Sequence, residues 1–88
     1  MKYYLEVGVT DHEGDEDGAY VELKDNSLDA ILSGLAEIGA FIEGDLPLRG
    51  SPSDLATRLR YGTVKTVLTD GRRMTAKIID DPEHTIGD

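Results

Sequence analysis

Hydrophobic and polar residues alternate at the start of the chain, which is typical of a β-strand with one buried face. The hydrophobic positions of this run are Met1, Tyr3, Leu5, Val7 and Val9. The same alternation returns over residues 19–24, after a polar, glycine-containing segment at residues 11–18. The two runs therefore predict an antiparallel hairpin with a long acidic loop.

A helical period of hydrophobic residues follows over residues 26–44. Its apolar positions are Leu28, Ile31, Leu32, Leu35, Ile38 and Ile42. Asn26 or Ser27 can cap the first turn through its side chain, and Gly44 suits a left-handed position after the last turn. We therefore expect an amphipathic helix from Ser27 to Glu43, in which Gly39 forms a notch for a closely packed neighbour.

The side of this helix opposite the apolar stripe carries few charges, which predicts a second covering element. The following segment offers Leu46, Leu48, Leu55 and Leu59 for that purpose, and a second copy of the chain is the alternative. Both a monomer and a homodimer therefore stay open.

Residues 51–54 carry the signals of a helix start, because Ser51 can act as the N-cap and Pro52 suits the first helical position. A short helix that ends near Arg60 is the prediction, and an extended conformation over residues 56–67 is the alternative.

A second hairpin is predicted around Thr69-Asp70-Gly71, a sequence suited to a three-residue loop with a left-handed glycine. This loop length fixes which residues share a face of the sheet. One face receives Val64, Thr66, Leu68, Met74, Ala76 and Ile78. The other face receives Lys65, Val67, Arg73, Thr75, Lys77 and Ile79.

These elements predict an α+β fold with the order β-β-α-α-β-β. Two hairpins would form a four-stranded antiparallel sheet packed against one main helix and a short second helix. We expect a single domain over residues 1–81 and a flexible acidic tail over residues 82–88.

The formal net charge is −9, and it is distributed unevenly along the chain. Residues 1–44 hold eleven acidic and two basic residues, whereas residues 45–88 hold seven of each. Binding to phosphates or to anionic membranes depends on cationic side chains, so this charge argues against nucleic acid and membranes as partners. The partner that we expect is another protein with a basic surface.

Localisation and redox state follow from what the sequence lacks. No stretch approaches the ~20 apolar residues of a membrane span, and the start has no signal-peptide cleavage site. The chain has no cysteine, which rules out disulfides and thiolate metal sites. We therefore expect a cytoplasmic protein.

The densest charged feature is the first predicted hairpin. The acidic residues that we expect to contact the partner are Asp11, Glu13, Asp15, Glu16, Asp17 and Glu22. The alternation from Glu13 to Gly18 is similar in part to a calcium loop, but Lys24 occupies the twelfth position, where an EF-hand needs an acid. We expect no metal there, and the alternative role of these acids is to keep the domain in solution.

Catalytic signatures are missing from the sequence. His12 and His84 lack the spacing of a metal motif, and no serine lies in a G-x-S-x-G context. The prediction is a non-catalytic protein without a cofactor that binds another protein. One form of this function is a nucleic-acid mimic, an inhibitor or regulator of the phage or mobile-element type.

Two alternatives belong to other functional classes. A nucleic-acid-binding module would use the basic residues of the second hairpin, which are Lys65, Arg72, Arg73 and Lys77. A small metal-assisted enzyme would need His12 in a concave pocket with two or more carboxylates.

Overall fold

The computed structural model describes residues 3–80 and contains four strands and two helices. In chain order they are β1 (Tyr3–Thr10), β2 (Glu16–Leu23), α1 (Leu28–Gly39), α2 (Pro52–Leu59), β3 (Val64–Val67) and β4 (Arg73–Asp80). This order confirms the predicted α+β class and the predicted short second helix. The expectations for Met1 and for an acidic tail over residues 82–88 lie outside the described residues.

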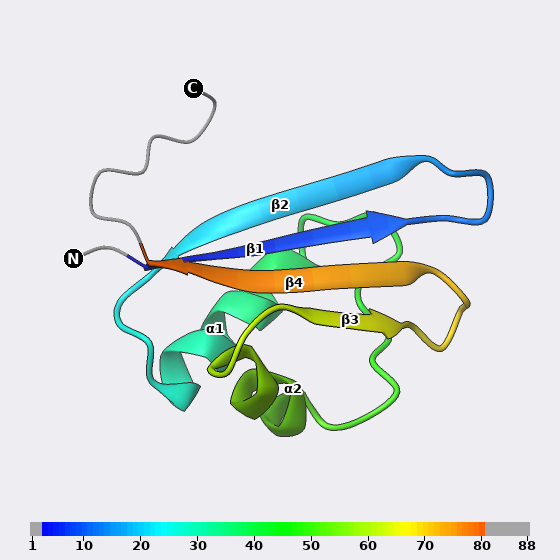
Figure 1. The fold of residues 1–88 in the computed structure, drawn as a ribbon. Helices are drawn as coiled ribbons and strands as arrows, with labels where there is room; N and C mark the ends of the chain where they lie inside the picture. The colour runs from blue at the N-terminus through cyan, green and yellow to red at the C-terminus, as the bar shows by residue number, and fades with distance from the viewer. Residues whose placement is uncertain (1–2, 81–88) are drawn as a thin grey trace.

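The four strands form one antiparallel sheet with the order β2-β1-β4-β3. The first and last strands of the chain therefore pair at its centre, and each hairpin supplies one edge strand. Both helices cover the same face of the sheet, and no helix of residues 3–80 lies on the other face (Figure 1). Helix α1 packs mainly under β2 and β1, while α2 contacts β3 and β4.

The core lies between the sheet and the helices. Its largest fully buried side chains are Leu5, Val7, Ile31, Ile38, Leu68 and Met74. The inward positions of both hairpins are those that the alternation predicts. The buried residues are Leu5, Val7, Val9, Val21 and Leu23 in the first hairpin and Val64, Leu68, Met74 and Ala76 in the second.

Helix α1 begins as predicted but ends four residues earlier than Glu43. The hydroxyl of Ser27 accepts a hydrogen bond from the Ala30 amide at 3.2 Å, which caps the first turn. After Gly39 the chain tightens into a turn that returns Ile42 to the core, where it is 3% exposed. Gly44 is left-handed, with φ of 84°, but it lies in this turn and not directly after the helix.

The close contact of α1 with the sheet occurs at Gly34, so the predicted notch at Gly39 is wrong. A Cβ atom at Gly34 would lie 2.6 Å from Leu23 Cδ2 and 3.2 Å from Leu5 Cδ2. A Cβ atom at Gly39 would meet nothing within 4 Å. The buried face of α1 is therefore centred on Ile31, Gly34 and Ile38. It is rotated about the helix axis away from Leu28 and Leu32, which the sequence placed on this face.

Helix α2 supplies part of the second cover that α1 needs. Ser51 caps it by accepting a hydrogen bond from the Asp54 amide at 3.1 Å, and Leu55, Ala56 and Leu59 are buried. Leu46 and Leu48, in the connector between the helices, pack against the same core. Phe41 stays 69% exposed.

No helix among residues 3–80 is long and apolar enough to cross a membrane.

Candidate functional site

The loop of the first hairpin is shorter than the sequence predicts, because β2 already starts at Glu16. The Asp11 amide donates to the Asp15 carbonyl at 3.0 Å, and the Gly14 amide donates to the Asp11 carbonyl at 3.1 Å. Gly14 has a φ of 87°, a backbone conformation that suits glycine. The loop is therefore the three-residue type that the sequence predicts for the second hairpin, where Gly71 plays the same part.

The two hairpin loops lie against each other, because β1 and β4 are neighbours in the sheet. His12 Nε2 lies 3.2 Å from the Asp70 carbonyl oxygen. The His12 ring also fills the space beside Gly71, where a Cβ atom would come within 2.6 Å of the ring. His12 is therefore an exposed residue that joins two loops.

Two of the six predicted acidic site residues act within the fold. One carboxylate oxygen of Asp11 accepts hydrogen bonds from the amides of Glu13 and Asp15, both at 2.9 Å. The Asp17 carboxylate accepts one from the Glu43 amide at 3.1 Å, which ties β2 to the turn after α1. These contacts hold the loop and the strand in place.

The other four predicted acids have exposed side chains. Glu13 and Asp15 lie on the loop, and Glu16 and Glu22 lie on the outer face of β2. The structure thus brings all six acidic residues onto one hairpin at one edge of the sheet.

Arg72 points into the fold, unlike the other predicted basic residues. Its side chain is 12% exposed, and Nε donates to the Asp70 carboxylate at 2.7 Å. Nη1 donates to the carbonyl of Glu43 at 2.8 Å, and Nη2 donates to those of Gly44 and Asp45 at 3.0 and 2.7 Å. Three guanidinium hydrogen bonds therefore fasten the second hairpin to the turn after α1, and the fourth stays within the hairpin.

The Asp70 carboxylate orients this arginine. The Arg72 amide donates to Asp70 Oδ1 at 3.1 Å, and the guanidinium binds Oδ2. The backbone hydrogen bond, helped by the side-chain bond and the positive charge of Arg72, lowers the pKa of Asp70 against a smaller opposing effect of burial. Asp70 therefore stays ionised below the ordinary range of an aspartate.

The remaining basic site residues, Lys65, Arg73 and Lys77, lie exposed on the outer face of β3 and β4. Lys77 Nζ is 3.8 Å from Glu6 Oε1 on the neighbouring strand β1. Both of these side chains are nearly half exposed, so water screens this ion pair.

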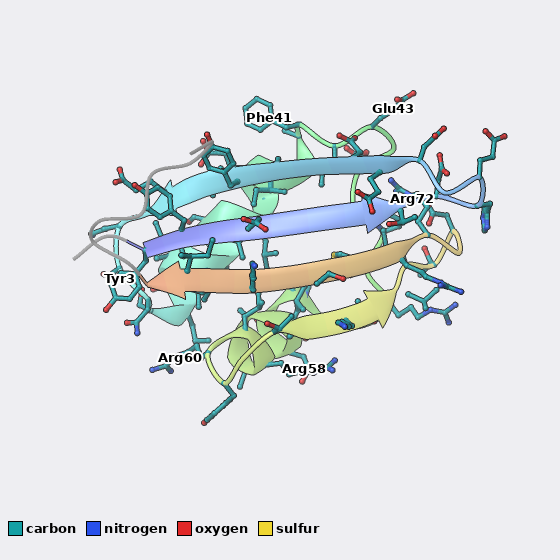
Figure 2. The ribbon with its side chains drawn as sticks, turned by 45° about the horizontal axis from the view of Figure 1, so that its top comes forward. Tyr3, Phe41, Glu43, Arg58, Arg60 and Arg72 are labelled. Carbon is teal, nitrogen blue, oxygen red and sulfur yellow. The ribbon has the colours of Figure 1, made fainter. Side chains whose placement is uncertain are left out.

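Acidic and basic residues separate across the molecule. We call residues 3–44, which form β1, β2, α1 and the turn after it, the acidic half, and residues 45–80, which form the connector, α2, β3 and β4, the basic half. Figure 2 shows Glu43 beyond the β2 side of the sheet, and Arg58 and Arg60 beyond the β3 side. The exposed basic residues of the basic half are Arg49, Arg58, Arg60, Lys65, Arg73 and Lys77. The uneven distribution of charge along the sequence thus produces an uneven distribution of charge over the surface.

A shallow hollow of about 530 Å³ crosses the outer face of the acidic half. We call it the glycine trough, because Gly8 and Gly18 pair directly across β1 and β2 and leave its floor without side chains. Its sides carry Glu6 and Tyr20 in one cross-strand row and Thr10 and Glu16 in the other. The trough therefore opens at the β2 edge between an aromatic ring and a carboxylate.

The trough was not among the predicted features, although the sequence holds its signal. Gly8 and Gly18 both occupy outward positions of alternating strands, and they face each other only once the three-residue loop fixes the register. The longer loop expected from the sequence places Gly18 in the loop and not in a strand, so this pairing was not predicted.

His12, which the metal-assisted alternative places in a pocket with carboxylates, lies on the exposed loop of the first hairpin. Among residues 3–80, no group of three or more histidine or carboxylate side chains is arranged to hold a metal ion. His12 faces Gly71 and the Asp70 carbonyl instead of a concave site.

Comparisons of the chain with protein-family models, with curated proteins and with solved structures gave no match.

Proposed function

We propose that this protein is a non-catalytic binding domain that presents its acidic half to a basic surface on another protein. The observation that carries the proposal is the strand order, which puts the first hairpin, with its acidic loop and β2, at one side of the sheet and the second hairpin, with its exposed basic residues, at the other. The exposed contact residues are Glu13, Asp15, Glu16 and Glu22, and Asp11 and Asp17 support them.

Rigid support makes these carboxylates better suited to recognition than a flexible acidic segment would be. A flexible loop loses conformational entropy when it is ordered by binding, whereas the Asp11 and Asp17 hydrogen bonds already order this hairpin. A negative potential concentrated on one side also orients an approaching basic partner and accelerates association.

One specific form of this function is nucleic-acid mimicry. Exposed carboxylates on a rigid hairpin can occupy a groove that normally binds phosphates, as an inhibitor or regulator of the phage or mobile-element type would do. In that form the protein competes with nucleic acid for its partner, and added duplex DNA releases the partner from the complex.

The test compares two variants that lose the same charge at different places. The hairpin variant combines Asp15→Asn and Glu16→Gln, and the control combines Asp45→Asn and Asp54→Asn, two exposed acids of the basic half. The immobilised proteins capture partners from a lysate of the producing cells, and binding is then measured with each purified partner. We expect the hairpin variant to bind at least about tenfold more weakly than the control. Equal affinities of the two variants would contradict the proposal.

A nucleic-acid-binding module stays the alternative from a different class. It would use Lys65, Arg73 and Lys77, which share the outer face of the basic half, whereas Arg72 would first have to release its hydrogen bonds to the backbone. A gel shift with duplex and single-stranded DNA at low salt tests it, and loss of that shift in Arg73→Ala with Lys77→Ala would support it over our proposal.

A further inference from the structure

We propose that strand β2 binds its partner by strand addition, so that an extended basic segment of the partner pairs with the β2 edge of the sheet. This inference rests on the proposed function and specifies the kind of contact that the acidic half makes. It is carried by the difference between the two edges of the sheet and by the glycine trough.

The β3 edge is short and covered. Strand β3 has four residues, and the connector before α2 runs beside its end. The Arg49 side chain donates from Nε to the Val67 carbonyl at 3.0 Å, and the Thr69 amide donates to the Pro47 carbonyl at 2.9 Å. Covering an edge in this way is a common protection against unwanted strand pairing.

The β2 edge is twice as long, and among the described residues the turn after α1 contacts it at the Asp17 side chain and not at the outward backbone groups. Strand β2 has eight residues, and its pairing with β1 runs without a bulge from Glu16 to Leu23. It contains neither proline nor lysine, two residues that often discourage pairing at an edge. No other described element pairs with this side of β2.

The register shows which backbone groups of β2 face outward. Asp11 and Asp15 form a hydrogen-bonded pair, and such pairs alternate with non-bonded pairs along an antiparallel ladder. The backbone groups of Glu16, Gly18 and Tyr20 therefore point away from β1. In the second hairpin Leu68 and Arg72 form the hydrogen-bonded pair, so the Val67 carbonyl points away from β4. This carbonyl is the group to which Arg49 donates.

Charge determines which strand can pair there. The hairpin carries the exposed acids Glu13, Asp15, Glu16 and Glu22, so its negative charge repels the same hairpin of a second copy and attracts lysine or arginine. The occupant is therefore a basic segment of another protein. A residue that pairs with Gly18 presents its side chain to the outer face, where the glycine trough can receive a long aliphatic stem. Its cationic end would then lie near Glu16 and the Tyr20 ring.

The test uses two synthetic peptides of equal charge and length. One alternates lysine and valine over eight residues and can form a strand, and the other replaces alternate valines with proline and cannot pair along its full length. Each is titrated into the ¹⁵N-labelled protein, with amide shifts and hydrogen exchange as the readouts. We expect the first peptide to bind at least about tenfold more tightly and to slow the exchange of the Gly18 and Tyr20 amides.

The outcomes separate the two proposals. Equal binding of both peptides, without protection of Gly18 and Tyr20, would contradict strand addition but keep the acidic half as the binding surface. No binding of either peptide at low salt would contradict the proposed function as well. Protection of these amides in the free protein, as in a dimer through β2, would also overturn the inference.

Substitutions at the edge and in the trough test the two parts of the inference. Tyr20→Pro removes an outward amide together with the ring beside the trough, and Lys65→Pro removes the matching outward amide on the β3 edge. Gly8→Val fills the trough at a position where a Cβ atom meets nothing within 4 Å. We expect Tyr20→Pro and Gly8→Val to weaken binding of the first peptide, and Lys65→Pro to retain it. Because Gly8→Val leaves the core untouched, full binding by that variant would remove the trough from the site.

Discussion

The Arg72 guanidinium donates a hydrogen bond to the carbonyl oxygen of Glu43 at 2.8 Å, so a side chain of the second hairpin binds the turn after α1. Helix α1 has no basic residue in its own last turn, and Arg72 brings a positive charge close to that end. The same turn is bound from the other side by Asp17 on β2. One corner of the molecule thus joins both hairpins and α1.

Replacing Arg72 with methionine should destabilise the fold. The substitution keeps much of the aliphatic volume but leaves three carbonyls and Asp70 Oδ2 without their guanidinium donor, at a cost of about 2 kcal/mol. For a domain of this size we expect Tm to fall by roughly 10 °C in thermal denaturation followed by circular dichroism. The adjacent Arg73→Met is the control, because Arg73 is exposed and should change Tm by much less.

Replacing Asp70 with asparagine should flatten the loss of stability at acid pH. The folded-state pKa of Asp70 is lowered, so its contribution is present above the ordinary aspartate pKa of about 3.9 and is lost as the pH falls through the folded value. Urea unfolding between pH 5 and 2.5 should therefore show a smaller decrease in the variant. Asp25, whose pKa is also lowered by hydrogen bonds with Ser27, accounts for part of the slope that remains. An unchanged slope would contradict the role of Asp70.

Alanine substitutions at two glycines of α1 should have opposite effects. Gly39→Ala gains up to about 1 kcal/mol of helix propensity, because its Cβ atom enters open space. Gly34→Ala gains the same propensity but forces Leu23 and Leu5 aside, which costs about 1–3 kcal/mol. Chemical denaturation should rank Gly39→Ala above the wild type and Gly34→Ala below Gly39→Ala. Equal stability of the two variants would contradict the close contact at Gly34.

Replacing Gly71 with alanine should destabilise the junction of the two loops. Its φ of 93° disfavours an L residue by about 1–2 kcal/mol, and the new methyl group would also displace the His12 ring. Adding His12→Ala should restore the stability lost to the clash with the His12 ring, but not the stability lost to the left-handed backbone conformation. A cycle of the two single variants and the double variant, measured by urea denaturation, separates these terms.

The sequence predicts those parts of the fold in which local pattern and tertiary packing agree. Strand alternation and the three-residue loop at Thr69-Asp70-Gly71 give the register of the second hairpin, which the structure confirms. Ser27 and Ser51 mark the helix starts because their side chains bond amides only three residues away. Such short-range signals need no knowledge of the rest of the chain.

Long-range contacts account for what the sequence does not predict. Helix α1 ends early because the turn after it is held by Asp17 and Arg72, which are 26 and 29 residues distant from Glu43. Gly34 lies one step from the expected stripe because Leu23 and Leu5 approach the helix backbone there. The sequence alone suggests that Arg72 is an exposed cation. Its acceptors are mostly backbone carbonyls, which every residue has and which no sequence motif can identify.

The acidic site combines both kinds of information. Composition alone indicates that the first hairpin carries the excess of acid, but only the strand order shows that it lies at an edge opposite the basic residues. The hydrogen bonds of Asp11 and Asp17 also divide the six acids into supporting and exposed members.

The most direct test of the central claim is an amide chemical-shift map of the ¹⁵N-labelled protein with a purified basic partner. Binding by the acidic half predicts that the largest shifts fall within residues 11–22 and that these shifts weaken as salt is raised. Shifts centred on Lys65, Arg73 and Lys77, with residues 11–22 unchanged, would contradict it.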